Sequence, residues 1–343
     1  MKALVLKQYN QFSYEDVPEP PIAADEVLVR DKACGICGSD VHGMDGSTGR
    51  RLPPIIMGHE ASGIIEKVGE SVNGWAPGDR VTFDSMLSCG QCRHCQRGAA
   101  NLCDRRRVLG VSCAEFRRDG AYAEYVAVPQ RILYRIPDGL SFEHAAMVEP
   151  LSVAVHAVGR MPVSLNDTAV VVGSGMIGLL VVQVLRLAGC GKILAVDLEP
   201  EKLELACRLG ADEGIRADST DVVAEVLART GGAGADLAFE VVGITPAVDL
   251  AVRSVRKGGA VSLIGNLSAK TDLPLQAVVT RELTLYGSCG SSGEYPACLE
   301  LLRRGAVQVE PFISGYSPLA EAPSWFDRLY KGEKGLMKVI VRP

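Results

Sequence analysis

The sequence has few aromatic residues and no excess of positive charge. Phenylalanine, tyrosine and tryptophan make up 5% of its 343 residues, and 36 lysines and arginines stand against 41 aspartates and glutamates, a net charge of −5. The lack of a basic excess argues against a nucleic-acid partner held by a general positive field. The charged fraction of 22% is too low, and the apolar fraction of 47% too high, for intrinsic disorder.

Long hydrophobic segments are also missing. Met1 leads directly into the alternating segment 2–6, with none of the apolar run that a secretory signal has. Residues 168–185 carry no charge and just reach the length of a transmembrane helix, but three glycines interrupt them. We interpret this stretch as a strand, a turn and a helix. We therefore expect a cytoplasmic protein with no membrane partner and, from its length, two domains.

The pattern of elements changes near residue 167. Before it, short alternating segments separated by Gly, Pro and Asp turns predict an all-β barrel or sandwich; they include 26–30, 63–68, 79–83 and 121–128. After it, apolar strands alternate with helical segments, which predicts a parallel sheet of six strands with right-handed crossovers. The final strand, residues 337–341, is expected to return to the first domain. The predicted fold class is α/β, with a doubly wound parallel Rossmann sheet beside an all-β domain.

A glycine-rich turn follows the first strand of this sheet and opens a helix. Gly173 permits a tight turn, Gly175 lets a pyrophosphate approach the backbone, and Gly178 lets helix and strand pack closely. Asp197, at the end of the next strand, can accept both hydrogen bonds of an adenosine ribose and would repel a 2′-phosphate. The pattern predicts NAD binding, with Met176 and Ile177 in the first helical turn over the phosphates.

Four cysteines lie in one short loop: Cys89, Cys92, Cys95 and Cys103. Four thiolates suit tetrahedral zinc, and a complete shell leaves no position for substrate, so the site is predicted to be structural. An iron–sulfur cluster is the alternative that this spacing leaves open.

A second set of metal ligands is spread along the first domain. Cys37 follows a strand, His59-Glu60 comes later, and Glu149 later still. Cys, His and Glu are the mixed donors that a catalytic zinc prefers, with one position left for water or substrate.

Together these motifs resemble the zinc-dependent medium-chain dehydrogenase/reductase superfamily over the whole chain. Within it, Glu149-Pro-Leu-Ser-Val153 is similar to the polyol (sorbitol-type) dehydrogenase branch, because the alcohol dehydrogenase branch has a cysteine where this chain has Glu149. The resemblance implies a GroES-like catalytic domain of residues 1–152 completed by 291–343, and a Rossmann NAD-binding domain of residues 153–290.

The resemblance also implies roles for the metal ligands. Cys37 and His59 would bind the catalytic zinc directly, while Glu60 and Glu149 would share the remaining contacts, one direct and one through water. Which of the two carboxylates is the direct ligand stays open, and Glu60 is counted among the catalytic residues.

Zinc would activate a hydroxyl, whose proton leaves through Ser39, the cofactor ribose and His42 while its carbon gives a hydride to NAD. Val242 and Gly243 are expected to approach the cofactor from one strand end, and Ser288 from another.

The substrate predicted from this branch is the secondary alcohol of a polyol or sugar alcohol. Members often carry an arginine-containing pair where this chain has Cys289-Gly290, so L-threonine, 2,3-butanediol and a polyol phosphate remain alternatives. A non-catalytic NAD-binding structural protein is the alternative of another class. Residues 282–288 should form an exposed sheet edge, which predicts a homodimer or a homotetramer.

Overall fold

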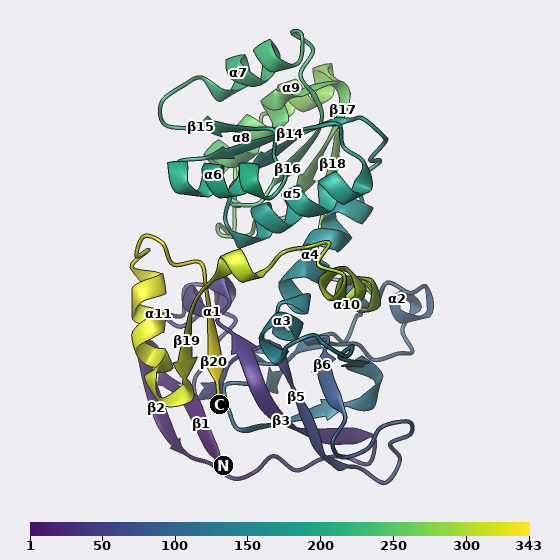
Figure 1. The fold of residues 1–343 in the computed structure, drawn as a ribbon, viewed down its shortest axis with the longest axis vertical. Helices are drawn as coiled ribbons and strands as arrows, with labels where there is room; N and C mark the ends of the chain where they lie inside the picture. Colours follow the sequence, from purple (N-terminus) through teal and green to yellow (C-terminus); the bar gives the residue numbers. More distant parts are fainter. The chain divides into compact units, whose positions relative to one another are not determined.

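The computed structural model describes residues 1–343, and the chain divides into two compact units. The first consists of Met1–Glu149 together with Ser292–Pro343, and the second of Pro150–Ser291. Figure 1 shows the β-rich first unit in purple, blue and yellow and the second in teal and green. No helix of the structure has the length and apolarity needed to cross a membrane.

The first unit is built on a sheet of seven strands in the order β12-β6-β5-β3-β20-β19, with β11 pairing to β3. These strands are β3 (Glu26–Gly35), β5 (Glu60–Val68), β6 (Arg80–Phe83), β11 (Tyr125–Pro129), β12 (Leu133–Arg135), β19 (Ile313–Pro318) and β20 (Lys338–Arg342). The C-terminal β20 lies antiparallel to β3, with Ile340 opposite Gly35. This pairing brings the end of the chain beside the segment that leads to Cys37.

Seven further strands complete the first unit. They are β1 (Lys2–Gln8), β2 (Gln11–Asp16), β4 (Ile55–Ile56), β7 (Met86–Leu87), β8 (Arg107–Val108), β9 (Val111–Ser112) and β10 (Arg117–Arg118). β11 begins four residues later than the strand expected at 121–128, because the N–H groups of Ala121 and Tyr122 bond the carbonyls of Gly58 and Met57 instead. Those bonds tie the chain to the segment just before His59.

The helices of the first unit are short. They are α1 (Gly38–Val41), α2 (Arg93–Gln96), α3 (Phe142–Ala146), α10 (Tyr295–Arg303) and α11 (Ala322–Tyr330), while α4 (Val148–Gly159) crosses the boundary between the units. In the core, the rings of Tyr122 and Phe326 meet edge to face with centroids 5.7 Å apart. Both side chains are fully buried, so α11 is packed onto the barrel by a large apolar contact.

The second unit contains a parallel sheet of six strands in the order β15-β14-β13-β16-β17-β18. The strands are β13 (Thr168–Val172), β14 (Lys192–Asp197), β15 (Glu213–Arg216), β16 (Ala235–Glu240), β17 (Val255–Leu263) and β18 (Thr284–Gly287). The helices are α5 (Met176–Ala188), α6 (Pro200–Arg208), α7 (Val222–Arg229), α8 (Thr245–Ser254) and α9 (Leu275–Thr280). Figure 1 shows α5 and α6 in front of the sheet and α8 and α9 behind it. The predicted Rossmann sheet of six strands is confirmed.

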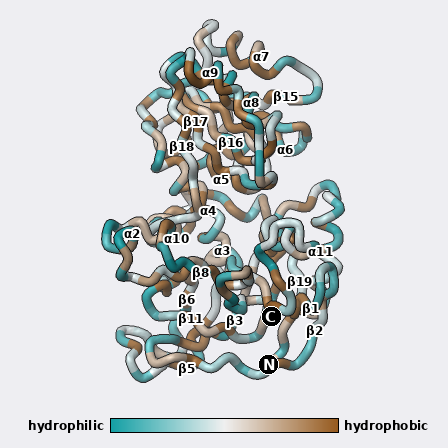
Figure 2. Tube along the Cα trace, turned by 180° about the vertical axis from the view of Figure 1, so that it is seen from behind, coloured by the Kyte–Doolittle hydropathy of each residue, from teal (hydrophilic) through white to brown (hydrophobic).

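Burial on both faces explains the apolar strands of this sheet. Val170, Leu194 and Val261 are fully buried, and Figure 2 colours much of β16 and β17 brown for hydrophobic residues. The strand order reverses between β14-β13 and β16, and in such sheets a ligand binds at the carboxyl ends of the strands at this point.

Candidate active site

Three of the expected metal ligands come together in the first unit. One donor atom from each of Cys37, His59 and Glu60 lies within 4.8 Å of the other two. Cys37 is the N-cap of α1, just after β3, and Glu60 begins β5 opposite Gly35. A Cβ on Gly35 would lie 2.2 Å from Glu60 Oε2, so only glycine leaves space for this carboxylate. A thiolate, an imidazole and a carboxylate in one close group fit a zinc ion.

Asp40 orients His59 and is a residue that the sequence analysis missed. Its Oδ2 lies 3.3 Å from His59 Nδ1, while Arg51 Nη2 lies 2.6 Å from its Oδ1 and the Tyr122 hydroxyl donates to Oδ2 at 3.0 Å. Burial alone would raise the pKa of Asp40, but His59 and Arg51 lower this pKa well below its usual value. A charged carboxylate beside Nδ1 leaves Nε2 as the metal-binding nitrogen, the arrangement by which proteins fix a histidine ligand.

A buried lysine balances the charge of Glu60. Lys338 Nζ lies 2.5 Å from Glu60 Oε2 and donates a second hydrogen bond to the carbonyl of Ile36 at 2.8 Å. Burial disfavours the lysine cation, but the charge of Glu60 offsets it and leaves the pKa of Lys338 raised. The other carboxylate oxygen, Glu60 Oε1, is buried without a hydrogen-bond partner. A buried oxygen of this kind, beside a thiol and an imidazole, fits a metal ligand.

Glu149 lies outside the close group of three. It stands in the first turn of α4. Burial raises its pKa to about 7, and the nearby charge of His59 opposes this rise while that of Glu60 adds to it. The Glu149 carboxylate is therefore near enough to interact electrostatically with both residues, although it is not part of the close group.

The two residues expected to carry the proton lie on one turn of α1. Ser39 Oγ donates to Cys37 Sγ at 3.3 Å, and both Ser39 and the C-cap residue His42 are exposed. The ring of His42 lies 6.5 Å from that of Tyr330, whose hydroxyl donates to Asp45 at 2.9 Å. The short helix thus places a hydroxyl beside the metal ligand and an imidazole at the solvent.

The four-cysteine loop also forms a close group. The Sγ atoms of Cys89, Cys92, Cys95 and Cys103 all lie within 4.8 Å of one another. Backbone N–H groups, first that of Gln91, and the Arg105 side chain lower the pKa of Cys89 to about 6, whereas burial raises the pKa of Cys103 to about 11. Arg105 itself is exposed, and its side chain is one of the groups that favour the Cys89 thiolate. The donor set fits a structural zinc.

The glycine-rich turn forms an open helix end in the second unit. Gly173 has φ of 99°, and a Cβ on Gly178 would lie 1.9 Å from the carbonyl oxygen of Gly173. Gly175 is the N-cap of α5 with no capping side chain, and a Cβ there would meet no atom within 4 Å. The space beside this helix end, with Met176 and Ile177 in the first turn, fits a phosphate group.

The other expected cofactor residues lie at the same edge of the sheet. Asp197 Oδ2 accepts the N–H of Ser174 at 2.6 Å, and Oδ1 accepts that of Leu198 at 2.8 Å. A Cβ on Gly173 would lie 2.6 Å from Val242 Cγ2, so the loop of Val242 and Gly243 contacts the phosphate-binding turn. At the end of β18, Ser288 Oγ is buried without a partner.

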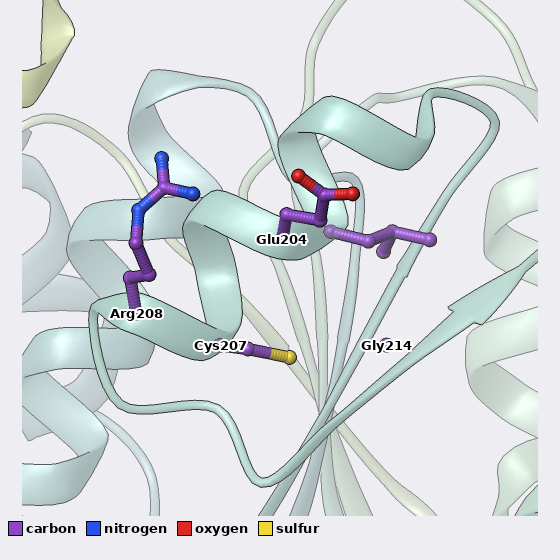
Figure 3. A pocket seen from close by; sticks show the side chains of 5 residues that line it. Glu204, Cys207, Arg208 and Gly214 are labelled. Atoms are coloured by element: carbon purple, nitrogen blue, oxygen red, sulfur yellow. The ribbon is translucent and has the colours of Figure 1, made fainter.

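A pocket elsewhere in the second unit contains none of these residues. It is lined by Leu203, Glu204, Cys207, Arg208 and Gly214. Figure 3 shows it between α6 and β15, with the Cys207 sulfur directed toward Gly214. Because it involves no predicted site residue, it does not belong to the candidate active site.

Comparison with known proteins identifies the family. Residues 23–138 match the model of the alcohol dehydrogenase GroES-like domain, and residues 177–304 match that of the zinc-binding dehydrogenases. Sorbitol dehydrogenase of Bacillus subtilis (strain 168) is 34% identical over 100% of this chain and 97% of its own. (R,R)-butanediol dehydrogenase of the same organism is 34% identical over 100% of both chains.

Solved structures agree. A dehydrogenase of the zinc-binding type from Sinorhizobium meliloti 1021, with NADP bound, has a TM-score of 0.92 and 34% identity, covering 100% of this chain and 99% of its own. The chain therefore belongs to the zinc-dependent medium-chain dehydrogenase/reductase superfamily, in its polyol dehydrogenase branch, and is an oxidoreductase that uses zinc and a nicotinamide dinucleotide to oxidise an alcohol.

Proposed function

We propose that the enzyme oxidises a secondary hydroxyl of a polyol or sugar alcohol with NAD+. The observation that carries the proposal is the close group of Cys37, His59 and Glu60. A second carboxylate, Glu149, stands where the alcohol dehydrogenase branch has a cysteine. A thiolate at this position would make the bound metal a softer Lewis acid. Carboxylate ligands favour a substrate that binds through two oxygens, as vicinal diols do.

The residues around the metal take separate roles in this proposal. Cys37 and His59 hold zinc, and Glu60 is the carboxylate of the inner group, its charge balanced by Lys338 at 2.5 Å. Glu149, outside the close group, would contact bound zinc through water. Zinc bound there would lower the pKa of a substrate hydroxyl, and NAD+ would accept the hydride. Ser39 would accept the hydroxyl proton and pass it through the cofactor ribose to His42, which would exchange it with solvent.

Catalysis and cofactor binding belong to different units in this proposal. We assign the catalytic domain to residues 1–152 and 291–343 and the NAD-binding domain to residues 153–290. The phosphates would lie at the open helix end of Gly175, between Gly173 and Gly178. Asp197 favours NAD over NADP because a carboxylate repels a 2′-phosphate.

2,3-Butanediol is the second candidate substrate. Cys289 and Gly290 follow β18, where the polyol branch often has an arginine-containing pair, and neither residue offers a charge to a phosphate or a long polyol. A small diol needs no such contact. The identity to a butanediol dehydrogenase supports the same possibility.

We also propose that the enzyme is a homo-oligomer, either a dimer or a tetramer of two dimers. β18 is the edge strand of the parallel sheet, and an unpaired edge favours pairing with a second copy. Leu275 and Val279 of the preceding α9 are 62% and 65% exposed. A monomer in light scattering at micromolar concentration would overturn this proposal. None of the eleven cysteines forms a disulfide, which supports a reducing compartment, the cytoplasm.

Activity on a substrate panel tests the proposal. Purified enzyme with NAD+ and zinc should reduce the cofactor with sugar alcohols or diols, and a chelator should abolish this. Cys37→Ser should remove both activity and one bound zinc. The matched control is Cys34→Ala, three residues earlier and fully buried outside the close group, which should retain both. No NADH production from any alcohol with zinc present would favour a non-catalytic protein.

A further inference from the structure

Glu240 ends β16 with its side chain folded back onto its own chain. Its Oε1 accepts the N–H of Val242 at 2.8 Å and that of Gly243 at 2.7 Å. Its backbone carbonyl accepts the N–H groups of Ile264 at 2.9 Å and Gly265 at 3.1 Å. One residue, only 1% exposed, thus connects the loops that follow β16 and β17 at the ligand-binding edge of the sheet.

The two loops fit together with no spare space. Gly243 has φ of 85°, and a Cβ on it would lie 2.4 Å from the N atom of Asn266. A Cβ on Gly265 would lie 2.1 Å from the N atom of Gly243. On its other side the first loop reaches the phosphate-binding turn, since Val242 Cγ2 would lie 2.6 Å from a Cβ on Gly173. A shift of Val242 would therefore be transmitted to that turn.

We propose that Glu240 is a positioning residue for the dinucleotide, holding the loop of Val242 and Gly243 against the turn of Gly173. The proposal rests on the cofactor site assigned above and adds a residue that does not touch the cofactor itself. Without the carboxylate, two N–H groups lose their acceptor and the loop loses the bonds that fix its distance from the turn.

The role depends on the acceptor oxygen and not on a negative charge. Glu240 Oε2 is buried with no hydrogen-bond partner, and Glu240 forms no salt bridge. Burial raises the pKa of Glu240, although the N–H groups of Gly243 and Val242 oppose the rise. A glutamine can present the same carbonyl oxygen to both N–H groups, whereas an aspartate is one methylene too short to reach them.

NADH affinity measured by fluorescence titration of the full-length, zinc-loaded enzyme tests this role. The variants are Glu240→Ala, Glu240→Asp and Glu240→Gln. The matched control is Asp236→Ala, at the opposite end of the same strand. Asp236 Oδ2 also accepts a backbone N–H, that of Thr168 at 2.8 Å, and its other oxygen pairs with Arg256 at 2.6 Å. Thermal unfolding of each variant reports its stability separately.

We expect Glu240→Ala and Glu240→Asp to raise the Kd for NADH by about tenfold or more, and Glu240→Gln to stay within about threefold of the wild type. Asp236→Ala should lower the unfolding temperature without changing the Kd. If the alanine variant does not fold, the aspartate and glutamine variants still decide the matter. Equal NADH affinity in wild type and Glu240→Asp, or equal loss in Glu240→Gln and Glu240→Asp, would overturn the proposal. Failure of the wild type to bind NADH would instead refute the cofactor site.

Discussion

Replacing the buried Lys338 by methionine should destabilise the enzyme more than the same substitution of an exposed lysine. The side chains of Lys338 and Glu60 are each 1% exposed and lie 2.5 Å apart. Methionine fills similar space but leaves the carboxylate of Glu60 buried without its cation. Removing one partner of a buried ion pair costs about 3–5 kcal/mol of unfolding free energy, because the remaining charge cannot be hydrated.

Urea unfolding followed by circular dichroism measures this loss on zinc-free protein, in which no metal ion beside Glu60 replaces the missing cation. The control is Lys67→Met, which breaks a pair of the same residue types with Glu19 at 2.6 Å, but with side chains 58% and 43% exposed. That variant should change the free energy by less than about 1 kcal/mol. The double variant Lys338→Met/Glu60→Gln should lose less than the sum of the two single variants, since it removes both charges. A loss for Lys338→Met no larger than that for Lys67→Met would refute the reasoning.

Three further predictions concern other parts of the molecule. Burial raises the pKa of Asp84 from the usual 3.8 to about 6, so the folded state binds the proton more tightly than the unfolded state and the free energy of unfolding falls as pH rises from about 4 to about 6. At 1.36 kcal/mol per pKa unit, Asp84→Asn should be more stable than wild type by about 3 kcal/mol at pH 8 and equally stable at pH 4. Identical urea midpoints of the two proteins at pH 8 would contradict this. Cys95→Ser should lower the zinc content measured by atomic absorption from about two ions per chain to about one, whereas retention of both would remove the loop from the list of metal sites. Asp197→Ser should shift the NADP-to-NAD ratio of kcat/KM upward by about tenfold or more, and an unchanged ratio would show that ribose recognition lies elsewhere.

The sequence predicts most of the second unit because its signals are local. Apolar strands, helical segments and the glycines at 173, 175 and 178 each indicate a structure from neighbouring residues alone. The parallel sheet of six strands follows from their alternation. In the first unit, two-residue strands such as Ile55–Ile56 and Met86–Leu87 were not predicted, because a ladder of that length leaves no pattern to detect.

The metal ligands of the candidate site could be predicted from the sequence, but the residues that hold these ligands in place could not. Cysteine, histidine and glutamate are the donors that zinc prefers, so the presence of all three types in one domain indicates a metal site. Lys338 and Glu60 are 278 residues apart, and the sequence around Lys338, the first residue of β20, does not indicate its partner. Asp40 stands only three residues after Cys37, yet its contact with Arg51 depends on the fold of the intervening loop. Charged residues are rarely buried, so only the structure reveals such pairs.

Diffraction from crystals of the zinc-loaded enzyme, recorded on both sides of the zinc absorption edge, tests the central claim most directly. The account predicts two anomalous peaks per chain, one bonded to Cys37 Sγ and His59 Nε2 and one among the four cysteines of the loop at 89–103. A peak at the four-cysteine loop alone, with Cys37 and His59 binding nothing, would contradict it.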